Sequence, residues 1–199
     1  LSHHNVDERW CLIHCTQMTP DETTALAKSG AVAGLCPITE ASLGDGIFDG
    51  VRYLDNGGRF GVGSDSNIRI SLDEELRTLE YTQRLRDKGR AMLATPDKST
   101  GRVLFEEACA GGALAAGRAS GSISTGMLAD LVALDAGHPN LVGRSGDSLL
   151  DSFIFAGGNR LVSDVWSAGR HRVHEGNHME RGRIIQRYIE TIRELNNIL

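Results

Sequence analysis

The sequence lacks an excess of basic residues and lacks long apolar runs. Its 21 Lys and Arg residues are outnumbered by 26 Asp and Glu residues, which give a net charge of −5. Because nucleic-acid-binding surfaces are rich in Lys and Arg, we expect no nucleic-acid partner. Every apolar run is far shorter than the ~20 residues of a membrane-spanning helix, so we expect no membrane segment. The sequence therefore predicts a soluble, cytoplasmic protein.

Cysteine is scarce as well, and its four copies follow neither a disulfide-like nor a zinc-like spacing. They lie in apolar segments, at Cys11, Cys15, Cys36 and Cys109. We therefore expect buried free thiols in a reducing compartment and assign them no chemistry. Because the chain begins with Leu1 rather than with Met, we also expect it to be a piece of a longer protein.

What the sequence does contain is an alternation of strand-like and helix-like segments. Three apolar runs of strand length cover residues 10–14, 31–37 and 59–65. Helical patterns follow at residues 19–30, 71–89 and 105–117. The alternation predicts an α/β fold with a parallel sheet, either doubly wound or part of a (β/α) barrel, because parallel neighbours need crossover connections. Three strands alone cannot close a barrel.

Two of the predicted helices carry start signals. Thr19 stands before Pro20, and Gly30 follows as a stop signal. Ser71 and Glu74 have the spacing of a capping box. We therefore expect a side-chain cap at both helix starts.

The composition changes in the second half of the chain, where Gly and Ser turns separate short strand-like runs. Two strands are expected on either side of a turn at Ala168 and Gly169. From Glu180 onward, apolar residues recur at helical spacing and predict an amphipathic helix. We therefore divide the chain into residues 1–118, 119–178 and 179–199.

Two polar residues stand where predicted strands end and are the leading candidates for chemistry. His14 ends the first strand, and Asp65 ends the third. In a parallel sheet both side chains would emerge on the same rim, where α/β proteins bind their ligands. The structural alternative is a hydrogen-bonded histidine at a strand end and an aspartate that caps the next helix. The residues alone leave both interpretations open.

Other polar residues suggest weaker sites. Thr39, Glu40 and Asp45 follow the second strand and could cap a loop, line the rim or touch a ligand. The glycines around the third strand do not form the strand-to-helix loop of a dinucleotide site. The late histidines alternate along a polar segment and favour a solvated edge over a metal site; they are His138, His171, His174 and His178.

Three segments carry a resemblance to a known family. They are RWCLIHCTQMTPDE, AVAGLCPITEASLGDGIFD and GGRFGVGSDSNIRISLDEELRTLEYTQRLRD. Together they resemble the last three barrel strands of the amidohydrolase superfamily, and most closely its N-formimino-L-glutamate deiminases. The later ADLVALD and DVWSAGRHRVHEGNH look like the small β-sandwich domain of that superfamily.

The resemblance implies strands six to eight of a metal-dependent (β/α)8 barrel, part of a small β-sandwich domain and a C-terminal helix. In the superfamily one divalent metal, usually zinc, is held by two histidines on the first strand, a histidine on the fifth and an aspartate on the eighth. Asp65 matches that aspartate, and His14 matches a catalytic histidine of the sixth strand. The other ligands and a proton-shuttling glutamate have no counterpart here. We therefore expect the N-terminal half as a partner and no activity in the isolated chain.

The activity that the resemblance implies is hydrolysis of N-formimino-L-glutamate to N-formyl-L-glutamate and ammonia, in histidine degradation. Asp65 would bind the metal and accept a proton from water, His14 would stabilise charge at the reacting carbon, and Arg69 is a local candidate for binding a substrate carboxylate. Two alternatives stay open. One is another deaminase or chlorohydrolase, acting on guanine, cytosine or a triazine, and the other is a non-catalytic binding module. A homodimer is a further possibility.

Overall fold

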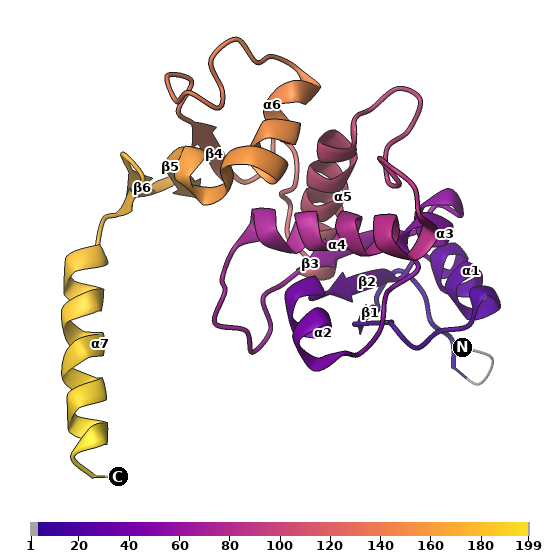
Figure 1. Cartoon of the computed structure of the whole chain (residues 1–199), viewed down its shortest axis with the longest axis horizontal. Helices are drawn as coiled ribbons and strands as arrows, with labels where there is room; N and C mark the ends of the chain where they lie inside the picture. The colour runs from indigo at the N-terminus through magenta and orange to yellow at the C-terminus, as the bar shows by residue number, and fades with distance from the viewer. Residues whose placement is uncertain (1–3, 199) are drawn as a thin grey trace.

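Two β-sheets of different type organise residues 4–198, the part of the chain that the computed structural model describes (Figure 1). The first sheet has parallel strands in the order β1 (Cys11–Ile13), β2 (Val32–Leu35) and β3 (Arg59–Val62). The second is antiparallel, in the order β4 (Leu131–Leu134), β5 (Val162–Ser167), β6 (Arg170–His174) and β7 (Asn177–His178). The predicted α/β arrangement of the first part is confirmed.

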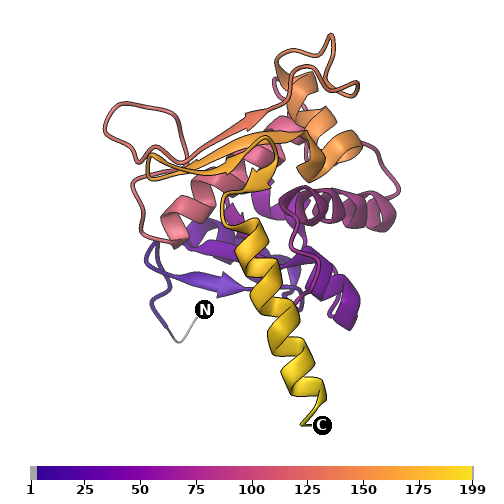
Figure 2. The same cartoon turned by 90° about the vertical axis from the view of Figure 1, so that its left-hand side faces the viewer.

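Helices accompany every strand of the parallel sheet. They are α1 (Pro20–Ser29), α2 (Pro37–Leu43), α3 (Gly50–Asp55), α4 (Leu72–Asp87) and α5 (Thr100–Ala115). Helices α1, α4 and α5 were predicted from the sequence, whereas the short helices α2 and α3 were not. In both views α5 lies between the two sheets (Figure 1, Figure 2).

The start of α1 is capped as predicted, but the start of α4 is not. Thr19 forms a full capping box with Glu22, and the predicted proline and glycine stand at the two ends of the helix. Ser71 makes no such bond, because its hydroxyl donates to the Asp73 carboxylate at 2.6 Å. The capping box predicted for Ser71 and Glu74 is therefore wrong.

The parallel sheet and its helices share one apolar core. Its fully buried large side chains include Leu26 on α1, Tyr53 on α3, Phe60 on β3, Leu76 on α4 and Leu104 on α5. Burying an aliphatic or aromatic side chain of this size stabilises a protein by about 1.5–3 kcal/mol. Helices from several parts of the chain therefore contribute side chains to the core that stabilises the sheet.

Tyr53 joins β2 to β3 where these two strands begin. Its hydroxyl lies 3.0 Å from the carbonyl oxygens of both Ala31 and Arg59. A side chain at Gly58 would lie only 2.5 Å from the Tyr53 ring, so glycine is required there. The amino ends of the two strands are thus held together by one buried phenol, and their opposite ends carry the candidate site.

Helix α5 packs very closely against β3. A Cβ atom at Gly111 would lie 2.0 Å from the carbonyl oxygen of Phe60, whereas one at Gly112 would meet nothing within 4 Å. The helix backbone therefore contacts the strand backbone directly, which only glycine permits. This contact fixes the strand that leads to Asp65.

A helical stretch interrupts the strands of the second part. It consists of α6 (Asp147–Ser152), a π-helix (Phe153–Gly157) and a 3-10 helix (Gly158–Leu161). Phe153, Ile154 and Leu161 from this stretch belong to the same core as the parallel sheet. The stretch was not expected from the sequence, and it ties the second part to α4 and α5.

Helix α7 (Arg181–Asn196) stands clear of both sheets (Figure 1). The predicted helical spacing is confirmed, yet none of its residues is buried. The apolar residues of the pattern are all exposed; they are Ile185, Tyr188, Ile189, Ile192 and Leu195. Within residues 4–198, no helix combines the length and the apolar character needed to cross a membrane.

Candidate active site

The candidate site lies on the rim where the three parallel strands end. His14 directly follows β1, Cys36 directly follows β2, and Asp65 follows β3 after two loop residues. Ligand atoms of the three side chains all lie within 4.8 Å of one another. The structure thus brings His14 and Asp65 together, although 51 residues separate them in the sequence.

His14 and Asp65 both have an unusual backbone conformation. Their φ angles are 68° and 49°, in the left-handed region that non-glycine residues rarely occupy. Such a conformation costs roughly 1–2 kcal/mol per residue. At His14 it is held by the backbone N–H, which donates to the Gly34 carbonyl at 2.8 Å. Strain of this kind is concentrated at functional sites, so it favours a role beyond simple structure.

The His14 ring lies between two carboxylates. Its Nδ1 atom is 3.2 Å from Glu40 Oε1, and its Nε2 atom is 3.8 Å from Asp65 Oδ2. The Nδ1 contact is a hydrogen bond with the Glu40 carboxyl group, which leaves Nε2 directed at Asp65. About a third of the His14 side chain is exposed, so a small molecule can reach Nε2.

Glu40 both caps the start of α2 and lines the rim, which are two of the roles that the sequence left open for it. Its Oε1 atom accepts a hydrogen bond of 2.7 Å from the backbone N–H of Cys36 at the start of α2, and it also contacts His14. Burial raises the pKa of the Glu40 carboxyl, and the hydrogen bonds from Cys36 and His14 oppose that rise. Pro37 at the first position of α2 is the local signal that could have placed Glu40 on a helix.

Asp65 is more open than Glu40, with 36% of its side chain exposed. The Ser66 hydroxyl donates to its Oδ1 atom at 3.3 Å, which leaves Oδ2 facing His14. The loop before it is held by Thr39, whose hydroxyl donates to the Ser64 carbonyl at 3.2 Å. Thr39 therefore supports the rim, and Asp65 makes no hydrogen bond that caps α4 among the described residues.

The donor set on this rim suits a divalent metal in part. Two atoms that each bind one zinc ion at about 2.0–2.2 Å lie no more than about 4.4 Å apart. The separation of 3.8 Å between His14 Nε2 and Asp65 Oδ2 meets that condition. Burial, together with the nearby carboxylates, raises the pKa of the Cys36 thiol to about 11, so Cys36 is a poor donor. Two suitable donors fall short of the three or four that zinc sites use.

A groove of about 810 Å³ runs alongside His14. Val6, Leu12 and Ile13 supply apolar surface to it, and Trp10 lies at its edge. The groove follows β1, which has no neighbour on that side among the described residues. Its position beside His14 gives a small molecule access to the rim.

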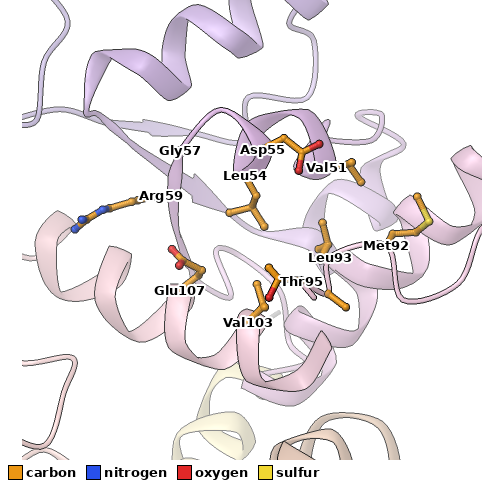
Figure 3. Close-up of a pocket in the computed structure, with 12 residues that line it drawn as sticks. Val51, Leu54, Asp55, Gly57, Arg59, Met92, Leu93, Thr95, Val103 and Glu107 are labelled. Atoms are coloured by element: carbon orange, nitrogen blue, oxygen red, sulfur yellow. The ribbon is translucent and has the colours of Figure 1, made fainter. Parts of the chain in front are cut away.

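A pocket of about 230 Å³ lies at the other end of β3, where that strand begins (Figure 3). Leu54 from α3, Leu93 from a loop and Val103 from α5 form its apolar lining. Asp55 and Glu107 are charged residues at this pocket. Parallel α/β folds bind their ligands at the opposite, carboxyl ends of the strands, so we assign the candidate site to the rim that bears His14.

Arg69 is already paired in this structure. Its guanidinium forms an ion pair with the Glu74 carboxylate at the start of α4. Arg69 would have to leave Glu74 before it could bind a substrate carboxylate. All four cysteines are free thiols, as predicted, but only Cys36 is buried, and the other three are partly exposed.

Comparison with known proteins places these features in a family. The profile of the amidohydrolase family matches residues 2–172. A formimidoylglutamate deiminase from Pseudomonas aeruginosa is 50% identical over 191 residues, which are 96% of this chain and 42% of that protein. The chain therefore spans less than half the length of this curated relative.

Solved structures give the same result. An amidohydrolase from Brucella melitensis has 45% sequence identity and a TM-score of 0.91, over 98% of this chain and 43% of that one. A zinc-bound adenosine deaminase from Xanthomonas campestris has 23% identity and a TM-score of 0.83, over 98% of this chain and 44% of the other. At that identity, the second likeness shows the fold alone.

Proposed function

The chain belongs to the amidohydrolase family, and on that premise we propose that it is part of a formimidoylglutamate deiminase. The reaction would convert N-formimino-L-glutamate and water into N-formyl-L-glutamate and ammonia. The observation that carries the proposal is the meeting of His14 and Asp65 on one rim, in a chain that is 50% identical to such a deiminase.

The fold of the whole enzyme is part of this proposal. Residues 1–118 would supply strands six to eight of a (β/α)8 barrel, residues 119–178 part of a small β-sandwich, and residues 179–199 a C-terminal helix. The open edges of the parallel sheet support this, because β1 and β3 each have only one neighbour among residues 4–198. A closed barrel would give each of them a second neighbour.

Asp65 is proposed as a metal ligand and as the proton acceptor. Its Oδ2 atom faces the space beside His14, while its Oδ1 atom is held by the Ser66 hydroxyl. A divalent ion, zinc in this proposal, would supply Lewis-acid chemistry when bound and lower the pKa of water toward ~7. The Asp65 carboxylate would take one proton from the attacking water as the water oxygen bonds to the formimino carbon. The bond from this carbon to the terminal nitrogen would then break. That nitrogen would take the proton held by Asp65 and the remaining proton of the added hydroxyl and leave as ammonia, while the carbon–oxygen bond would become the formyl carbonyl.

His14 is proposed to stabilise charge at the reacting carbon. Its Nε2 atom is 3.8 Å from Asp65 Oδ2, so a substrate bound at the open side of this pair would touch both residues. Glu40 holds the opposite ring nitrogen at 3.2 Å and so fixes the orientation of the imidazole. Arg69 is also proposed to bind a substrate carboxylate. To do so, its guanidinium would have to leave the Glu74 carboxylate with which it is now paired.

The rest of the enzyme is the expected partner of this chain. Asp65 is the one metal ligand that this proposal assigns to the chain, so the other ligands would come from the N-terminal half, and the isolated chain would be inactive. The apolar face of α7 is exposed and would be covered by that half or by a second copy of the chain. The free cysteines fit a cytoplasmic location.

A chimeric enzyme tests the proposal. In it, this chain replaces the matching part of the Pseudomonas aeruginosa deiminase, which restores a full-length protein. We expect ammonia release from N-formimino-L-glutamate and none from guanine, cytosine or a triazine. Metal content and a monodisperse elution profile show that the chimera has assembled. An assembled chimera that acts on guanine or cytosine instead would support the rival deaminase function.

A further inference from the structure

The antiparallel sheet carries a second group of side chains able to bind a metal, on β5 and β6 (Figure 1). Asp164 lies on β5, and His171 and His174 lie on β6. The Oδ1 atom of Asp164 is 2.8 Å from His171 Nε2 and 3.1 Å from His174 Nδ1. All three ligand atoms lie within 4.8 Å of one another. This group belongs to a different sheet from the rim that bears Asp65.

The two imidazole rings of this group are held in place by their neighbours. His171 pairs with Trp166 across the two strands, and their rings stack with centroids 4.7 Å apart and planes within 10°. The His174 ring lies edge-on to His171 at 5.3 Å. Its other nitrogen, Nε2, is 4.0 Å from a carboxylate oxygen of Glu175. A carboxylate beside the second nitrogen is the usual support of a metal-bound histidine.

The spacing of the donor atoms suits a tetrahedral ion. Corners of a tetrahedral zinc site lie about 3.3 Å apart when the bonds are about 2.0–2.1 Å long. The observed 2.8 Å and 3.1 Å need only a few tenths of an ångström of opening, which the exposed His174 side chain and the partly exposed Asp164 and His171 can provide.

We propose that Asp164, His171 and His174 form a binding site for a divalent transition metal of the zinc class. The ligand atoms would be Asp164 Oδ1, His171 Nε2 and His174 Nδ1, with water in the fourth position. Two imidazoles and one carboxylate make a donor set that zinc accepts. The ring protons would then reside on His171 Nδ1 and on His174 Nε2, which is 4.0 Å from the Glu175 carboxylate. The ion would join β5 to β6 and would take no part in the deiminase reaction.

Trp166 offers a direct readout of this site. The sequence has two tryptophans, and Trp10 is the other. A Trp10→Phe variant of the full chain therefore reports on Trp166 alone. Because Trp166 stacks on His171, Ni²⁺ bound to that ring would quench its fluorescence. We expect quenching to saturate at one equivalent of Ni²⁺ and to be reversed by excess Zn²⁺. An ion on the rim near Asp65 would leave this signal unchanged.

Matched variants in the Trp10→Phe chain complete the test. His174→Gln alters a side chain that is 63% exposed, so the fold should survive, and we expect its Ni²⁺ affinity to fall at least ~10-fold. Asp164→Asn should have the same effect. The control His178→Gln, on neighbouring β7, should bind Ni²⁺ with the same affinity as the Trp10→Phe parent. If Trp166 is not quenched, or if His174→Gln and Asp164→Asn bind like the parent, the three residues are a hydrogen-bonded strand contact and the proposal is overturned.

Discussion

The Nδ1 atom of His14 lies 3.2 Å from the Oε1 atom of Glu40, a carboxylate whose side chain is only 5% exposed. This contact determines which ring nitrogen of His14 carries the hydrogen-bonded proton and which one faces the open side of the rim. Glu40 does not itself face that open side. It therefore acts through His14, as a positioning residue.

Replacing Glu40 with Gln should impair catalysis while preserving the fold. The amide oxygen of the new side chain can still accept the hydrogen bond from the Cys36 backbone, but the negative charge that holds His14 is lost. We expect kcat of the chimeric enzyme to fall ~10–100-fold with little change in KM, because supporting partners of site histidines have effects of that size. Steady-state kinetics and the pH profile of kcat measure the change.

The control for this substitution is Glu8→Gln, which alters an exposed carboxylate near the beginning of the chain. It should leave kcat and the pH profile unaltered. If Glu40→Gln behaved like this control, Glu40 would serve only the start of α2.

Replacing Asp65 with Asn separates a metal ligand from a helix cap. Asn keeps the shape and can still accept a hydrogen bond, so a cap would cost little activity. As ligand and proton acceptor, Asp65 is essential, and loss of the general base alone is worth ~10²–10⁴-fold in rate. We expect the chimeric enzyme with Asp65→Asn to fold, to lose its turnover and to hold less zinc. Ammonia release and elemental analysis measure these effects.

The neighbouring substitution Ser66→Ala is the matched control and should be mild, because it removes one hydrogen bond of 3.3 Å to Asp65. If Asp65→Asn kept more than about a tenth of the parental turnover, the loss would be smaller than removal of a general base causes. That result would contradict the proposed role of Asp65.

Two adjacent glycines of α5 should respond to alanine in opposite directions. Gly111→Ala places a Cβ atom 2.0 Å from the Phe60 carbonyl oxygen and should destabilise the chain by about 1–3 kcal/mol. Gly112→Ala meets nothing within 4 Å and should stabilise by up to ~1 kcal/mol through helix propensity. Urea denaturation of the two variants measures the difference. Equal midpoints would mean that α5 does not lie against β3 as described.

Glu75 should make stability depend on pH. Its Oε1 atom is the one buried side-chain oxygen or nitrogen without a hydrogen-bond partner among the described residues, although Oε2 accepts from the Ile38 backbone N–H. Burial raises the pKa of this carboxyl above its ordinary 4.5, against the opposing effect of Ile38. The folded state therefore holds the proton more tightly than the unfolded state does. Its stabilising contribution is complete below pH 4.5 and is lost as the pH rises through the folded-state pKa.

The variant Glu75→Gln has no such ionisation. We expect it to be more stable than the parent at neutral pH and to lose that advantage as the pH falls through the folded-state pKa of Glu75, with no further loss below pH 4.5. Denaturant midpoints across this pH range measure the effect, with the exposed Glu8→Gln as the control. If the difference in denaturant midpoint between Glu75→Gln and the parent stayed constant over this pH range, the raised pKa of Glu75 would not be its cause.

Local signals in the sequence were enough to predict the parallel sheet and the ends of α1. Thr19 and Gly30 act through the backbone of their own helix, so no distant contact is needed to interpret them. The ends of β1 and β3 could also be predicted from the sequence. Because the strands pair in parallel, His14 and Asp65 then had to lie on the same rim.

Features that depend on distant contacts were not predictable. Ser71 has the right spacing for a capping box, but Asp73 takes its hydroxyl, and nothing in the spacing chooses between the two partners. The helical stretch around Phe153 is buried by α5 and the parallel sheet, which lie far away in the sequence. The meeting of Asp164 with His171 and His174 depends on the register and the bulge of β5 against β6, which local spacing does not determine.

The hydroxyl of Tyr53 also bears on the order in which the chain folds. Its two acceptors are 22 and 6 residues away in the sequence, so the unit β2–α3–β3 closes short loops. Contacts across β4 and β5 span longer ones, such as the 30 residues between Ser163 and Ala133. Short loops cost less entropy to close. We therefore expect the pairing of β2 with β3 to gain amide protection before the pairing of β4 with β5.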